Sequence, residues 1–183
     1  MQSFTIVTPI YGVIRQEVEI VLNSFSQFYY SVTKKHRSNL NLVLLFDNEI
    51  QLDIIRLAKT LNINDAVIAV WNNKIELPSL VLNNPSIMFL PFFKEKPEWI
   101  SLALFNGLPV LSYEMGADQL LLDNSCGMQI TNLPNEESIA VFAGWLKMLY
   151  FDPGAFEMLR KGAKSKYNVV LPLRNEQYLT KVA

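Results

Sequence analysis

The stretch "LNLVLLFDNEIQLDIIRLAKTLNINDAVIAVW", residues 40–71, decides the fold. It begins with "LNLVLLF", an apolar run of the length of one strand, and ends with a second such run, "AVIAVW", at residues 66–71. Between them, from residue 49 onward, apolar residues recur at the spacing of a helix. Apolar strands separated by a helix are typical of a parallel sheet that is covered on both faces. The stretch therefore predicts one strand–helix–strand unit of such a sheet.

The rest of the chain repeats this alternation. Further strands are expected at residues 3–8, 86–92, 108–113 and 128–131. Helices are expected at residues 17–30, 75–84, 97–105, 136–150, 154–167 and 174–182, with Pro97 in a first turn and Asn135 as an N-cap. Because strand–helix–strand crossovers are right-handed, six such strands predict a doubly wound, Rossmann-like α/β fold. We expect a single domain over residues 1–183.

Composition limits the classes of partner. Half of the residues are hydrophobic and 18% are charged, which indicates either a sheet buried on both faces or an extra surface for a partner. The 16 basic and 17 acidic residues give a net charge of −1, and the only basic cluster is the short run at residues 34–37. No nucleic-acid partner is therefore expected.

The cysteine and histidine content excludes several kinds of site. Cys126 is the only cysteine and His36 the only histidine, so neither an internal disulfide nor a His/Cys metal cluster can be built from them. No apolar run reaches the length of a membrane span, and the start of the chain has no signal-peptide pattern. We expect a cytoplasmic location, no transmembrane segment, no metal and no cofactor.

A ligand of such a sheet would bind at the carboxyl ends of the strands, near the switch in strand order. The first loop there, "TPIYGVIRQE", contains neither GxGxxG nor the P-loop pattern. The loop at residues 91–97 leads directly into a helix N-terminus, where backbone N–H groups and nearby Lys94 and Lys96 suit a phosphate. The alternative is that these lysines are ordinary exposed loop residues.

Several segments, in order and spacing, resemble the C-terminal, donor-binding half of retaining GT-B glycosyltransferases. "ELPSLV…PSIMFLPF" from residue 76 is similar to the family's ELPALY…ADVFVLPS, and "NGLPVLS" is similar to its CGLPVIA. Gly116 falls on the first glycine of its Gly-Gly loop, and the tail "NLPNEESIAVFAGWLKMLYFDPGAFEMLRKGAKSKY" follows the family's tail. The resemblance implies a nucleotide-sugar donor, a glycan or lipid acceptor, and a separate N-terminal Rossmann-like acceptor domain or partner chain.

The positions that carry donor binding in that family depart from its pattern here. Aligned on Pro97, the two carboxylates of the family's E-x7-E motif fall on Lys94 and Leu102, and a leucine cannot accept hydrogen bonds from a ribose. Glu95 lies one residue out of register.

The cationic positions that would hold the donor diphosphate are also changed. The family's Arg and Lys after the first strand fall on Tyr11 and Gln16, while Arg15 is the nearest cation. The family's Glu after the Gly-Gly loop falls on Leu120. The candidate donor-pocket positions are those on the first, fourth and fifth loops: Tyr11, Arg15, Gln16, Lys94, Glu95, Pro97 and Gly116.

Three functions remain open from the sequence. The first is a glycosyltransferase half with displaced donor contacts and impaired catalysis. The second is a degenerate, non-catalytic domain that acts as a binding or scaffold partner. The third is an epimerase of the same architecture, which would need carboxylates and a histidine from another half.

Overall fold

The computed structural model describes residues 3–46, 52–71, 76–94, 96–114, 121–131 and 133–179. Two of the candidate donor-pocket positions, Glu95 and Gly116, lie outside the described residues, as does Leu120.

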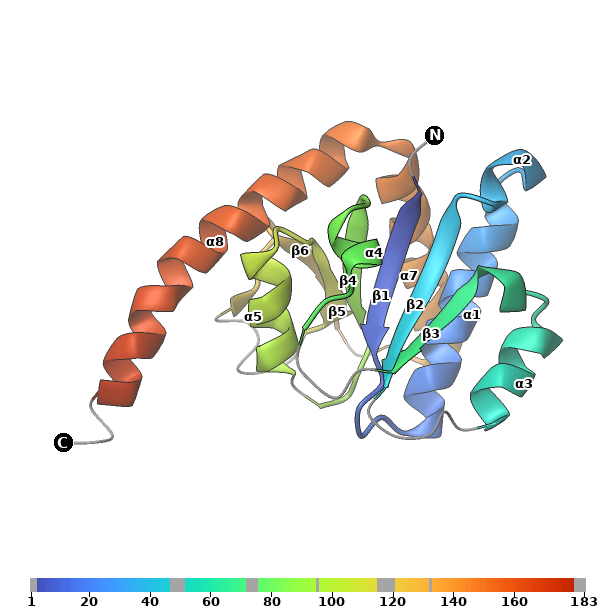
Figure 1. Ribbon diagram of the computed structural model, residues 1–183, viewed down its shortest axis with the longest axis horizontal. Coiled ribbons are helices and arrows are strands. Elements are labelled where there is room, and N and C mark those ends of the chain that lie inside the picture. Colours follow the sequence, from blue (N-terminus) through green and yellow to red (C-terminus); the bar gives the residue numbers. More distant parts are fainter. Residues whose placement is uncertain are drawn as a thin grey trace.

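Six strands form one parallel sheet in the order β3-β2-β1-β4-β5-β6, which confirms the predicted doubly wound α/β fold (Figure 1). The strands are β1 (Phe4–Pro9), β2 (Leu40–Phe46), β3 (Val67–Trp71), β4 (Ser86–Leu90), β5 (Val110–Tyr113) and β6 (Gly127–Ile130). Strands β1, β4 and β5 are buried along their whole length, as expected for strands with apolar side chains on both faces.

The helices cover both faces of the sheet (Figure 1). They are α1 (Arg15–Ser31), α2 (Lys34–Arg37), α3 (Leu52–Thr60), the 3-10 turn η1 (Asn64–Ala66), α4 (Ser79–Leu82), α5 (Pro97–Phe105), α7 (Asn135–Phe151) and α8 (Pro153–Leu179). Helix α1 packs against both α7 and α3 on one face, while α5 lies on the other face and packs against α8. Burial of the sheet on both faces accounts for part of the high apolar content of the chain, while large apolar side chains such as Trp71 and Phe105 are exposed.

Aromatic rings fill the core between the sheet and α7. Phe142 of α7 lies 5.0 Å from Phe89 of β4 and 5.4 Å from Tyr113 of β5, measured between ring centroids, and both contacts are edge-on. Phe4 of β1 makes an edge-on contact with Tyr150 at 5.4 Å. Edge-to-face pairs of this kind stabilise a core beyond the area that they bury.

Two expectations for the C-terminal part were wrong. Residues 154–167 and 174–182 were expected to form separate helices, but the residues between them continue the helix, so that α8 is one long element. Asn135 is the first residue of α7 and not its N-cap, which is Pro134. The Asn135 amide oxygen instead accepts a hydrogen bond from Gln16 Nε2 on α1, at 3.1 Å.

The change in strand order lies between β1 and β4, where the chain leaves the two neighbouring strands in opposite directions. The loops that follow these strands, described at residues 10–14 and at residues 91–94 and 96, therefore lie where ligands of such sheets bind.

Candidate functional site

Glu17 organises the first of the two loops at the switch in strand order. Helix α1 begins at Arg15 without a side-chain cap on Ile14, and Glu17 takes over this role from inside the helix. Its Oε2 accepts a hydrogen bond from the backbone N–H of Ile14 at 2.9 Å. A carboxylate in the first turn also interacts favourably with the helix dipole.

The other carboxylate oxygen of Glu17 reaches across to the second loop. Oε1 accepts a hydrogen bond from the backbone N–H of Phe93 at 2.6 Å, and Glu17 as a whole is only 4% exposed. Hydrogen bonds to an ionised acceptor are about twice as strong as neutral ones, and a buried carboxylate is costly without them. Glu17 therefore ties the loop after β4 to the start of α1.

Lys96 makes the complementary link in the opposite direction. Its Nζ donates a hydrogen bond to the backbone carbonyl of Tyr11 at 2.7 Å, and the ammonium group lies 5.9 Å from the centroid of the Phe92 ring. The Tyr11 ring packs on Trp99 of α5, with the centroids 5.3 Å apart. The two loops are thus joined by an anion from one side and a cation from the other.

Stacking adds a third attachment of the second loop. The Phe93 ring stacks on the Tyr113 ring of β5 at 5.4 Å between centroids and 16° between ring planes. Tyr113 is fully buried, and this burial raises the pKa of its hydroxyl group. Phe93 is therefore held through both its backbone and its side chain.

The predicted donor-pocket positions that the structure describes fall into separate environments. Tyr11 lies beside the second loop through its contacts with Lys96 and Trp99. Gln16 points to α7 through Asn135. Lys94 is exposed, and Pro97 is half-buried at the first position of α5.

Leu102, at the second position of the carboxylate motif, lies in the middle of α5 and packs against the core. Its side chain offers no hydrogen-bonding group for a donor sugar. An apolar side chain at this position therefore contributes to packing of the core.

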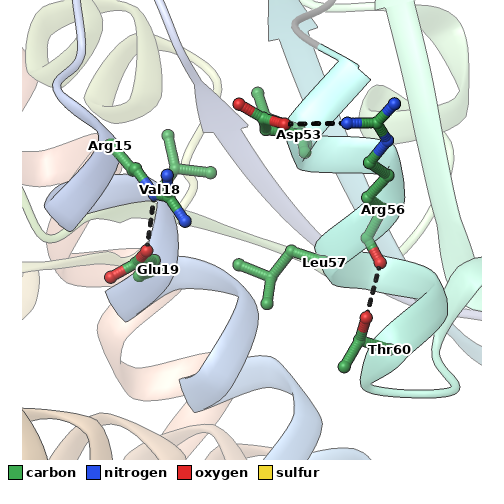
Figure 2. Close-up of a pocket in the computed structure, with 8 residues that line it drawn as sticks. Arg15, Val18, Glu19, Asp53, Arg56, Leu57 and Thr60 are labelled. Atoms are coloured by element: carbon green, nitrogen blue, oxygen red, sulfur yellow. Dashed lines mark hydrogen bonds and ion pairs between the residues drawn. The ribbon is translucent and has the colours of Figure 1, made fainter.

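Arg15 lines a pocket between α1 and α3 (Figure 2). The pocket has a volume of about 280 Å³. Its lining consists of two ion pairs, apolar side chains and one threonine: Arg15, Val18, Glu19, Asp53, Ile54, Arg56, Leu57 and Thr60.

Both arginines of this pocket already have acidic partners. Arg15 Nε lies 2.9 Å from Glu19 Oε1, and Arg56 lies 3.6 Å from Asp53 (Figure 2). The hydrogen bond with Glu19 raises the pKa of the Arg15 guanidinium. Because these pairs are exposed, each contributes little to stability.

Within the residues that the structure describes, no group of three or more His, Cys, Asp and Glu side chains is placed to hold a metal ion. In the same part of the chain, no helix has both the length and the apolar character that a membrane span requires.

Solved glycosyltransferase structures superpose on almost the whole chain. The pneumococcal O-GlcNAc transferase GtfA, in complex with UDP and GlcNAc, covers 99% of the chain with a TM-score of 0.77 at 12% sequence identity. The sucrose-phosphate synthase of Thermosynechococcus elongatus covers 99% with a TM-score of 0.69 at 14% identity. HepE of Anabaena, in complex with UDP, covers 98% with a TM-score of 0.67 at 13% identity. The chain has the fold of one half of a GT-B glycosyltransferase.

This GT-B half corresponds to 35% of GtfA, 45% of the synthase and 49% of HepE, so the chain spans less than half the length of each. The match is consistent with the C-terminal half of the fold, as the sequence motifs predicted. The sequence matches no known family model and no curated protein sequence.

Sequence reasoning missed Glu17 and the partner of Lys96. Glu17 follows Ile14, the N-cap of α1, by three residues, and a glutamate at this position commonly accepts a hydrogen bond from the N-cap N–H. The sequence therefore carries a local signal for this first hydrogen bond of Glu17. No local signal indicates that the second Glu17 oxygen would meet Phe93, because the two residues are 76 positions apart.

Proposed function

We propose that this chain is the nucleotide-sugar-binding half of a GT-B glycosyltransferase, with impaired donor catalysis. The observation that supports this most strongly is the superposition of 99% of the chain on GtfA in its UDP complex, with HepE in complex with UDP as a second case. The donor would be a nucleoside diphosphate sugar, and the acceptor a glycan or a lipid. A donor site without a metal and a cytoplasmic location belong to the same proposal.

In this proposal the donor lies at the loops after β1 and β4. The N-terminus of α5 and the cationic side chains of Lys94 and Lys96 would face its phosphates. Tyr11, Gln16, Pro97 and the positions outside the described residues, Glu95 and Gly116, complete the candidate pocket. Arg15 is placed for this role only if it leaves Glu19.

An N-terminal Rossmann-like half or a partner chain would complete the cleft. The solved GtfA/B complex, which superposes on 99% of the chain with a TM-score of 0.74 at 14% identity, is one precedent for assembly by a protein of this fold. Sites between domains are a common place for small-molecule ligands.

A second function is a non-catalytic scaffold that keeps the fold and binds a partner half. The observation that favours it is the link between the two loops through Glu17 and Lys96. Groups of the protein itself already use the backbone N–H of Phe93 and the ammonium group of Lys96. Leu102 also contributes no carboxylate.

Thermal unfolding in the presence of nucleotides distinguishes the two functions. Whichever of UDP, GDP, ADP or their sugars the protein binds should stabilise it by about 2.7 kcal/mol at 100 times the dissociation constant. Lys94→Glu should weaken that binding, whereas Lys35→Glu makes the same charge change on exposed α2 and should not. Absence of any stabilisation at millimolar nucleotide would refute the donor-binding proposal. A stable complex with a co-expressed N-terminal half, without donor turnover, would support the scaffold.

A further inference from the structure

The contacts between the two loops at the crevice form a reciprocal pair, which we call the latch: Glu17 with Phe93, and Lys96 with Tyr11. Glu17, in the first turn of α1, binds the backbone of the second loop, and Lys96, at the start of α5, binds the backbone of the first loop. The two contacts therefore join the segment around residues 10–17 to residues 93 and 96.

The Glu17 link is the stronger of the two on physical grounds. Glu17 is almost fully buried, and both of its oxygens accept backbone N–H groups. Water cannot readily replace these bonds as long as the site stays closed, so release of Phe93 requires movement of the loop. The Lys96 bond has a neutral acceptor, and Lys96 itself is only half-buried.

We propose that the latch is an autoinhibitory contact, in which Glu17 keeps the crevice between β1 and β4 closed and competes with a nucleoside diphosphate for the loop before α5. This rests on the proposed donor function. Phe93 lies in the segment that leads into the N-terminus of α5, the place suited to a phosphate. One backbone N–H cannot serve the Glu17 carboxylate and a phosphate at full strength. Donor affinity is then reduced by the fraction of molecules with an open crevice.

The test uses three substitutions. Glu17→Ala removes the Glu17 contact of the latch and its charge, whereas Glu17→Gln removes the charge and keeps a side chain of the same length with an acceptor oxygen. Glu157→Ala is the matched control, because Glu157 is an exposed glutamate of α8 that pairs with Arg160 and takes no part in the candidate pocket. Hydrogen exchange of the Phe93 amide reports opening of the latch, and titration with UDP, GDP and ADP reports affinity.

We expect Glu17→Ala to speed exchange at Phe93 and to tighten nucleotide binding, each by about tenfold or more, with Glu157→Ala unchanged. Glu17→Gln should give the smaller gain. If the two Glu17 variants gain affinity equally, charge alone explains the effect and the latch is refuted. Unchanged exchange at Phe93 in Glu17→Ala also refutes it.

Two further outcomes distinguish failure of the latch proposal from failure of the proposed donor function. If no variant binds any nucleotide, the proposed donor and its competition with Glu17 are refuted, while exchange at Phe93 still decides whether the latch holds the loop. If Glu17→Ala does not fold, Lys96→Met takes its place for the exchange measurement. That variant should open the loop by a smaller factor, and unchanged exchange in it would overturn the proposal.

Discussion

Gly162→Ala should destabilise the protein through a single methyl group. Gly162 lies in α8, where a Cβ atom would lie 1.7 Å from the backbone carbonyl oxygen of Ser125 and 2.6 Å from its carbon. Carbon and carbonyl oxygen approach no closer than about 3.3 Å, so helix and turn must separate by roughly 1.5 Å. The obstacle is backbone and not the end of a flexible side chain, so it cannot rotate away.

The surrounding contacts make that separation costly. One helical turn further along α8, Lys166 Nζ lies 2.7 Å from Asp123 Oδ2, and Asp123 in turn accepts a hydrogen bond from the backbone N–H of Ser125 at 2.9 Å. Movement of α8 away from Ser125 therefore strains this ion pair as well. Overpacking of a filled site costs about 1–3 kcal/mol, and the higher helix propensity of alanine returns about 1 kcal/mol. With the ion pair strained as well, we expect a net loss of about 2 kcal/mol.

Gly144→Ala is the matched control. Gly144 lies in α7, and a Cβ atom there would meet nothing within 4 Å. This variant keeps the propensity gain without the clash and should be more stable than the parent by up to about 1 kcal/mol.

Urea unfolding followed by circular dichroism measures the free energy of unfolding of both variants, and thermal unfolding should show a fall in Tm of about 4–8 °C for Gly162→Ala. The reasoning is refuted if Gly162→Ala is as stable as the parent, or if the two variants gain stability equally.

Three further predictions test other parts of the structure. Lys166 and Ser125 lower the pKa of Asp123 to about 2. Asp123→Asn should therefore lower the free energy of unfolding at pH 7, and because the pair with Lys166 is partly exposed we expect a loss of about 1 kcal/mol. Because the folded-state pKa lies below the unfolded value, this gap should shrink as the pH falls from about 4 towards 2 in urea titrations, and a constant gap would contradict it. Burial raises the pKa of the Cys126 thiol, so a thiol reagent should modify it only upon unfolding; rapid labelling of the native protein would show that it is accessible. The buried hydroxyl group of Thr8 has no hydrogen-bond partner among the described residues. Thr8→Val removes this group and should raise the free energy of unfolding by about 1 kcal/mol. A loss of stability in this variant would indicate that the hydroxyl group has a partner.

The architecture was largely predictable from local patterns. The expected strand at residues 40–46 is β2 itself, and the helix expected at residues 97–105, with Pro97 in its first turn, is α5. Apolar periodicity and a proline that fits only the first turn of a helix act within a few residues, so the sequence alone carries them. The tail was less predictable, since α8 continues where two helices were expected.

For the candidate site, the sequence indicated which loops to consider but not the contacts that they make. The loops at residues 10–14 and 91–96 lie where the parallel-sheet rule places a ligand, and Lys96 lies in the second of them. Its expected partner was a phosphate, but its ammonium group is bound to the carbonyl of Tyr11. Gln16 likewise meets Asn135, which is 119 residues away.

By itself, the sequence determined the alternation of strands and helices, the apolar residue at Leu102 and the absence of a histidine or cysteine cluster. Only the tertiary structure decided that Glu17 links α1 to the loop after β4 by accepting the N–H of Phe93, and that Gly162 must lack a side chain beside Ser125. Secondary structure follows from hydrogen bonds and burial over a few residues. These two contacts instead depend on where distant loops and helices meet after the sheet has formed.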